Sequence, residues 1–133
     1  MLQGINWLAV LVAGVAGYLL GVIWYTPAVF GKRWVAALGK NPEDLGSPAV
    51  PLIVSAVTTA LTCLCLALLL RGLGIESLAA GVVCGIVIGC GIVFTSMLSD
   101  YLFQSKSMTL LWIQGGYRML YIVLICAIIG AWS

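Results

Sequence analysis

The stretch WYTPAVFGKRW, residues 24–34, ends a long apolar segment and begins a short amphipathic one. Trp24 and Tyr25 stand where the apolar segment ends, and amphipathic aromatic rings gather at the level where a helix leaves the hydrocarbon. Lys32 and Arg33 follow within a few residues and belong among water and headgroups. The stretch therefore predicts a membrane boundary, and the segments on either side of it predict how often the chain crosses.

The residues after the boundary predict a short amphipathic helix, 27–39, that lies in the membrane interface. Thr26 is a suitable N-cap, and Pro27 suits the first helical position, where a missing N–H costs little. Apolar side chains recur there at four-residue spacing and basic ones fall on the opposite side, which is typical of a helix at the acyl boundary. This interfacial motif, either a simple anchor or the cytoplasmic rim of a site, consists of Trp24, Tyr25, Thr26, Pro27, Phe30, Gly31, Lys32 and Trp34.

The composition identifies lipid as the solvent of this chain. Of its 133 residues, 63% are hydrophobic and 8% are charged, and the mean hydropathy is +1.20. A soluble domain of this size has about a quarter of its residues charged. The net charge of +2 is too small and too scattered for a nucleic-acid interface. We therefore expect membrane lipids, and no nucleic acid, as partners.

Four stretches that are nearly free of charge predict four transmembrane helices. A span needs about 20 predominantly apolar residues, and we place the spans near residues 6–25, 49–70, 77–99 and 109–132. Backbone groups in hydrocarbon must bond within their own segment, and no segment alternates like a barrel strand. We expect one domain, residues 1–133, of the all-α class: an integral membrane four-helix bundle with an interfacial helix between spans one and two.

The basic residues of the loops predict the orientation. The first connection carries Lys32, Arg33 and Lys40, and the third carries Lys106, whereas the second carries only Arg71. Basic loops stay on the cytoplasmic side of a membrane. We therefore expect the first and third loops in the cytoplasm, with both termini outside it, in a plasma (inner) membrane.

Glycines at four-residue spacing predict that two of the helices pack closely. The third span carries Gly81, Gly85 and Gly89, and the first carries Gly17 and Gly21. Such spacing lets two backbones approach, so that dispersion replaces the hydrophobic drive that lipid removes. The ridge on the third span can pack inside one bundle or between the subunits of a homo-oligomer, and the sequence leaves both open.

Arg118 is the residue that we single out for chemistry. It lies about ten residues into the last span, where a charge is costly unless it is paired or hydrated. A short loop makes the last two spans neighbours, so we expect Asp100, at the end of the third span, to pair with Arg118. The candidate ligand-binding set also includes Gln114, Tyr117 and Tyr121. The pair is either a structural ion pair or a site for an anion that arrives from the cytoplasm.

Other chemistries find little support. The five cysteines lie in apolar spans, where the thiolate that a metal needs is disfavoured, and the chain has no histidine. We expect no metal and no cofactor. We also expect no enzymatic activity, since the sequence shows no nucleophile–base pair, phosphate loop or carboxylate dyad. A small multidrug exporter of similar size is disfavoured, because proton-coupled export of that type needs a carboxylate near the middle of the first span. None of the four acidic residues lies there.

The motif of residues 24–34, in the form W-Y-T-P-x-x-F-G-K-x-W, resembles the signature of a bacterial family of small four-helix membrane proteins catalogued as a domain of unknown function. Asn6-Trp7 and the segments 116–118 and 127–132 are similar to that family as well. The resemblance implies a bacterial integral membrane protein without an established activity, and it supplies no catalytic residue.

Two functions therefore stay open. The protein binds or moves a small anionic or lipidic molecule at an Asp100/Arg118 site, or it is a structural or accessory membrane protein that acts through helix–helix assembly. A polar cavity that connects these residues to the cytoplasm would favour the first function, and a dry, direct ion pair would favour the second.

Overall fold

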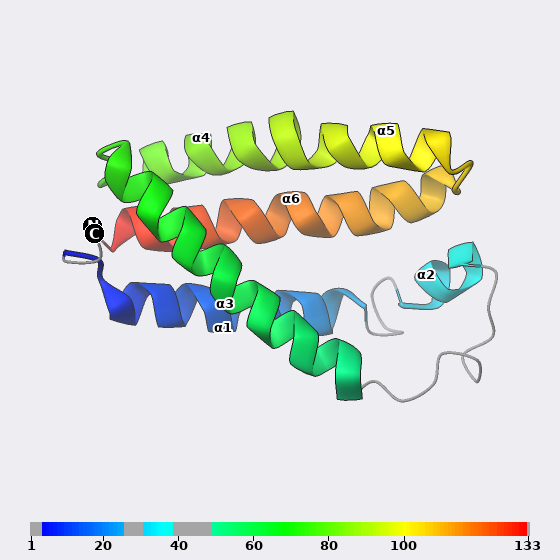
Figure 1. Ribbon diagram of the computed structural model, residues 1–133, viewed down its shortest axis with the longest axis horizontal. Coiled ribbons are helices and arrows are strands. Elements are labelled where there is room, and N and C mark those ends of the chain that lie inside the picture. The colour runs from blue at the N-terminus through cyan, green and yellow to red at the C-terminus, as the bar shows by residue number, and fades with distance from the viewer. Residues whose placement is uncertain (1–3, 26–30, 39–48, 133) are drawn as a thin grey trace.

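The computed structural model describes residues 4–25, 31–38 and 49–132, and every regular element in them is a helix (Figure 1). Four helices are long and apolar enough to cross a membrane. They are α1 (Trp7–Trp24), α3 (Ala49–Gly72), the continuous helix Leu78–Phe103, and α6 (Met108–Ala131). The predicted all-α fold, with four spanning helices and one short helix, is confirmed.

The helix α6 is the centre of the bundle. It packs against every other helix that the structure describes. Figure 1 shows α6 between α1 and the layer of α4 and α5, while α3 crosses the bundle obliquely. Leu111, Ile125 and Cys126 of α6 are fully buried, whereas α1 and α3 expose many large apolar side chains on their outer faces. Lipid is the natural solvent of such faces.

The helix Leu78–Phe103 contains a π-helical segment. It begins as α4 (Leu78–Ile88), continues as η2 (Gly89–Phe94), and ends as α5 (Thr95–Phe103). A π turn closes on the fifth residue and so contains one residue more than an α turn. The face that packs on α6 therefore advances by one residue beyond Gly89, and Phe94 and Tyr101 lie on it, in one buried cluster with Leu111 of α6.

The glycine ridge of α4 packs inside the chain. A Cβ atom on Gly81 would lie 2.5 Å from the backbone oxygen of Cys126, and one on Gly85 would lie 2.7 Å from the Cα of Val123. Carbon atoms in ordinary contact stay about 3.5–4.0 Å apart, so only glycine lets α4 approach α6 this closely. Of the two roles that the sequence left open for this ridge, the structure shows packing within one bundle.

Side-chain caps fix the end of the bundle where the first and last spans meet. The Oδ1 of Asn6 accepts a hydrogen bond from the backbone N–H of Ala9, which caps α1. The Nδ2 of the same side chain donates to the backbone oxygen of Trp132 at 2.6 Å. The start of α1 is therefore held beside the end of α6, and two of the segments that resemble the family signature lie together.

The short helix α2 (Gly31–Leu38) lies at the other end of the bundle, near α5 and the start of α6 (Figure 1). It packs against α6, and Lys32 and Arg33 on it are exposed. It is the described part of the interfacial helix expected over 27–39. Thr26, Pro27 and Phe30, and with them the predicted N-cap, lie outside the described residues.

Candidate functional site

A cavity of about 430 Å³ lies between α1, α3 and α6, with Trp34 of α2 at one side. We call it the Arg118 cavity, after the charged side chain that lines it. Its volume is within the range of small-molecule sites. Around Arg118 the cavity carries the hydroxyl-bearing side chains of Tyr18, Tyr25, Ser55, Thr58, Thr59 and Tyr117.

The Arg118 guanidinium lies over two aromatic rings. Its central carbon is 5.3 Å from the ring centroid of Tyr117 and 5.7 Å from that of Tyr121. Such cation–π contacts offset part of the cost of a charge in apolar surroundings. They leave the N–H groups of the guanidinium available for hydrogen bonds. Within residues 4–25, 31–38 and 49–132, no carboxylate forms an ion pair with Arg118.

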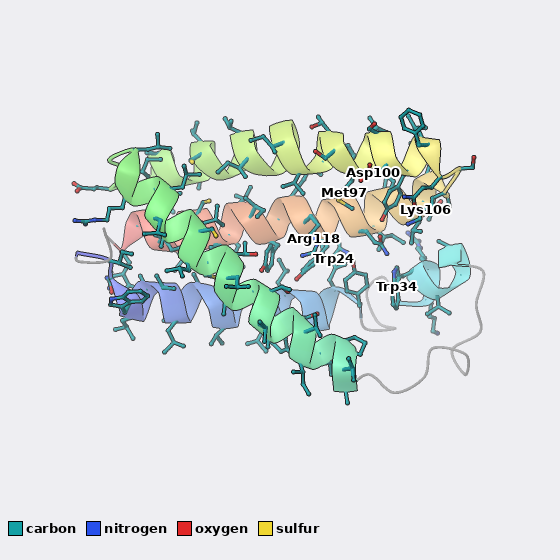
Figure 2. All side chains as sticks on the ribbon, viewed as in Figure 1. Trp24, Trp34, Met97, Asp100, Lys106 and Arg118 are labelled. Atoms are coloured by element: carbon teal, nitrogen blue, oxygen red, sulfur yellow. The ribbon has the colours of Figure 1, made fainter. Side chains whose placement is uncertain are left out.

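The expected pair of Asp100 and Arg118 is therefore not formed in the described part of the chain. Arg118 lines the cavity on the side of α6 that faces α1 and α3, whereas α5 lies on the other side of α6 (Figure 1). On α5, which follows the π-helical segment, Tyr101 is buried and Asp100 is exposed (Figure 2).

Gln114, which lies on α6 like Arg118 and was expected beside it, is bonded to Tyr101 of α5 instead. The hydroxyl of Tyr101 donates a hydrogen bond to the Oε1 of Gln114. The Nζ of Lys106 lies 4.9 Å from the centroid of the Tyr101 ring. Of the residues predicted to surround Arg118, the structure therefore brings Tyr117 and Tyr121 to it, while Gln114 bonds to α5.

Aromatic rings connect α2 to the middle of α6. The ring centroids of Trp34 and Tyr25 are 5.0 Å apart, those of Tyr25 and Tyr117 are 5.5 Å apart, and those of Tyr117 and Tyr121 are 5.4 Å apart. The predicted interfacial motif is therefore continuous with the rings beneath Arg118.

Glycines of α1 make room for these tyrosines. A Cβ atom on Gly21 would lie 2.7 Å from the Oη of Tyr117, and one on Gly17 would lie 3.1 Å from the ring of Tyr121. The predicted packing role of both glycines thus takes a specific form, because each lets a large ring of α6 lie against the backbone of α1.

The two tryptophans of the motif differ in their hydrogen bonds. The Nε1 of Trp24 donates to the backbone oxygen of Ile113 at 2.9 Å and so ties the end of α1 to α6. The Nε1 of Trp34 is buried and has no hydrogen-bond partner. Leaving a buried donor without a partner costs about 1–3 kcal/mol. Trp34 also lines the cavity, so the cavity wall includes one unsatisfied N–H donor.

The cavity combines one positive charge, that of Arg118, with hydroxyl groups that stay neutral. Burial raises the pKa of Tyr25, the residue that follows α1, to about 12, although the positive charge of Arg118 acts in the opposite direction. The phenol therefore keeps its proton well above neutral pH and can donate a hydrogen bond. A guanidinium among neutral hydroxyl groups is an arrangement that can bind a carboxylate or a phosphate.

The hydroxyl groups of α3 are the part of the cavity that the sequence analysis missed. Ser55, Thr58 and Thr59 lie three and four residues apart, so they share one face of the helix, and all three line the cavity. Thr58 also donates to the backbone oxygen of Ser55 at 3.0 Å. The spacing was a usable signal, but such hydroxyls commonly bond their own backbone, which made them a weak one.

The described residues offer no obvious place for a metal. Within them, no group of three or more His, Cys, Asp or Glu side chains comes together. The five cysteines are free thiols.

Comparison with known proteins gives one match. A family model described as "Protein of unknown function (DUF1761)" matches residues 8–130, which takes in nearly all of the four long helices and every residue that lines the Arg118 cavity. No curated protein and no solved structure matches the chain. The chain therefore belongs to DUF1761, a family of proteins of unknown function.

Proposed function

We propose that this protein binds a small anionic molecule, or the anionic headgroup of a lipid, at Arg118 in the cavity between α1, α3 and α6. One observation carries the proposal. Arg118 lies inside a spanning helix, lines a cavity of about 430 Å³, and has no carboxylate partner in the part of the chain that the structure describes. A charged side chain at such a depth is expensive, and in membrane proteins it commonly marks a functional site.

The surroundings of Arg118 support an anion over a cation. Arginine presents its N–H groups in a planar fork that fits two oxygen atoms of a carboxylate or phosphate. The hydroxyls of α3 and the phenols of α1 and α6 add further donors around it. In this proposal the tyrosine rings hold the guanidinium, and the α3 hydroxyls help to select the anion.

The proposal also takes an orientation from the basic loops. We place α2 and the loop between α5 and α6 on the cytoplasmic side of a plasma (inner) membrane. The Arg118 cavity then lies in the cytoplasmic half of the bundle, between the level of Trp34 and the middle of α6, and its anion would come from that side.

Binding of butyl phosphate to the protein in phosphatidylcholine nanodiscs tests the proposal. We expect Arg118→Gln to weaken binding by about 10–150-fold, because a hydrogen bond to a charged group contributes about 1.5–3 kcal/mol. Arg71→Gln is the matched control, since Arg71 lies at the other end of the bundle and donates to the backbone oxygen of Gly4 at 3.0 Å. It should bind as the wild type does.

Two results would contradict the proposal. The first is equal affinity of the wild type and the Arg118→Gln variant for butyl phosphate. The second is a folded wild type that binds no butyl phosphate, together with an Arg118→Gln variant whose only defect is instability. That result would assign Arg118 to the structural role that the sequence also allowed.

A further inference from the structure

We infer that the ligand is an anionic lipid taken from the surrounding bilayer, with its headgroup at Arg118 and one acyl chain in a groove between α1 and α3. The inference rests on the proposed function and names the chemical class of the ligand. The molecule that occupies the Arg118 cavity is then a lipid of the bilayer and not a free anion.

The groove is a second cavity, of about 570 Å³, between α1 and α3, the helix that crosses the bundle obliquely in Figure 1. It runs from Trp7 to Leu19 on α1, and the side chains that line it are apolar apart from Tyr18 and Thr59. Small residues on both helices, Gly14 and Ala60 among them, line it where large side chains would fill the space. An apolar groove of this kind suits a hydrocarbon chain.

The groove and the Arg118 cavity adjoin at Tyr18 and Thr59, which line both of them. In the proposed complex a single molecule extends from one into the other past these two side chains. Along this path the lining changes from the charged Arg118 to hydroxyl groups and then to apolar side chains. That order matches an anionic headgroup, its polar linkage and an acyl chain, and a small water-soluble anion would use only the first part of it.

The length of the groove also fits a lipid. Trp7 and Tyr18 are 11 residues apart on α1, which corresponds to about 16 Å at about 1.5 Å per residue. The hydrocarbon core of a bilayer is about 30 Å thick, so the groove is about as long as one leaflet is deep. With the headgroup at Arg118, near the middle of α6, an acyl chain along the groove would have its end near Trp7, at the start of α1.

The test compares two probes that share a phosphate but differ in their apolar part. Phosphatidic acid in phosphatidylcholine nanodiscs has two long acyl chains, and butyl phosphate has only four carbons. Affinities are measured for the wild type, Arg118→Gln, Ala60→Trp and Val57→Trp. Ala60 is exposed in the groove, and a tryptophan there would fill it. Val57 is 55% exposed on the same helix and lines neither cavity, so Val57→Trp is the matched control.

We expect the wild type to bind phosphatidic acid at least tenfold more tightly than butyl phosphate. Ala60→Trp should lose that preference while it binds butyl phosphate like the wild type, and Val57→Trp should keep it. Arg118→Gln should lose affinity for both probes, by at least tenfold.

Three results would overturn the inference. If Ala60→Trp has no effect and the wild type binds both probes equally, the inference fails and the proposed function stands. If neither the wild type nor any variant binds either probe, the inference and the proposed function both fail. If Ala60→Trp converts an oligomer into a monomer, measured by light scattering, the groove is a contact between subunits and holds no lipid.

Discussion

Replacing Gly85 by alanine tests the contact between α4 and α6 that holds the bundle together. The new Cβ atom would lie 2.7 Å from the Cα of Val123 and 3.2 Å from the Cβ of Cys126. Since both neighbours belong to a packed helix, α4 must move away by about 1 Å to restore ordinary contact, and a gap of that size forfeits a quarter to a half of each contact it opens. We expect the free energy of unfolding to fall by about 1–3 kcal/mol, as for other overpacked cores.

The matched control is Gly91→Ala on the same helix. A Cβ atom on Gly91 meets nothing within 4 Å, so this variant should be as stable as the wild type or more stable by up to about 1 kcal/mol, through helix propensity alone. Unfolding in mixed micelles, followed by circular dichroism, measures both variants. Equal stability of the Gly85→Ala and Gly91→Ala variants would refute the packing argument. If the Gly85→Ala variant is as stable as the wild type but no longer forms an oligomer, the glycine ridge of α4 is a contact between subunits.

Two further predictions concern the interfacial motif and the topology. Trp24→Phe should lower the free energy of unfolding by about 0.5–1.5 kcal/mol, because it removes the hydrogen bond to Ile113. Trp34→Phe should lower it less, because the Nε1 of Trp34 has no partner to lose. Chemical denaturation measures both variants, and an equal loss would contradict this difference in hydrogen bonding. In a cysteine-free background, a membrane-impermeant maleimide added to intact cells should label Glu76→Cys and spare Lys106→Cys, and the reverse pattern would invert the proposed orientation.

The fold class was within reach of the sequence because lipid imposes so few solutions. Segments without charge must be helices if they cross a bilayer, and their length limits where they begin and end. The third span shows the limit of this argument. We expected the helix to end at residue 99, because the apolar pattern fades at Ser99 and Asp100. The helix continues to Phe103, because its backbone hydrogen bonds continue through these polar residues.

The site was predictable in part. The depth of Arg118 in the last span identified it, and its contact with Tyr121, three residues on, follows from helical spacing. Its contact with Tyr117, the preceding residue, does not. Its separation from Asp100 was not predictable, because it depends on which side of α6 each helix packs, and the π turn in η2 also changes which residues of α5 face α6. No residue type specifies a π turn strongly. The α3 hydroxyls could not be assigned either, since their role depends on the angle at which α3 crosses α1.

The central place of α6 has a consequence for how the protein is made. All the other described helices pack on α6, yet it follows them in the chain and therefore enters the membrane after them. At synthesis rates of about 5–20 residues per second, the 107 residues from Tyr25 to Ala131 take about 5–20 s. During that time the glycine face of α1 has no α6 to pack on. The glycine face of α4 is in the same position for the 43 residues from Gly89 to Ala131, or about 2–9 s. Those faces therefore stay unpacked until α6 is made, and a chain that stops before Met108 would lack the helix on which they pack.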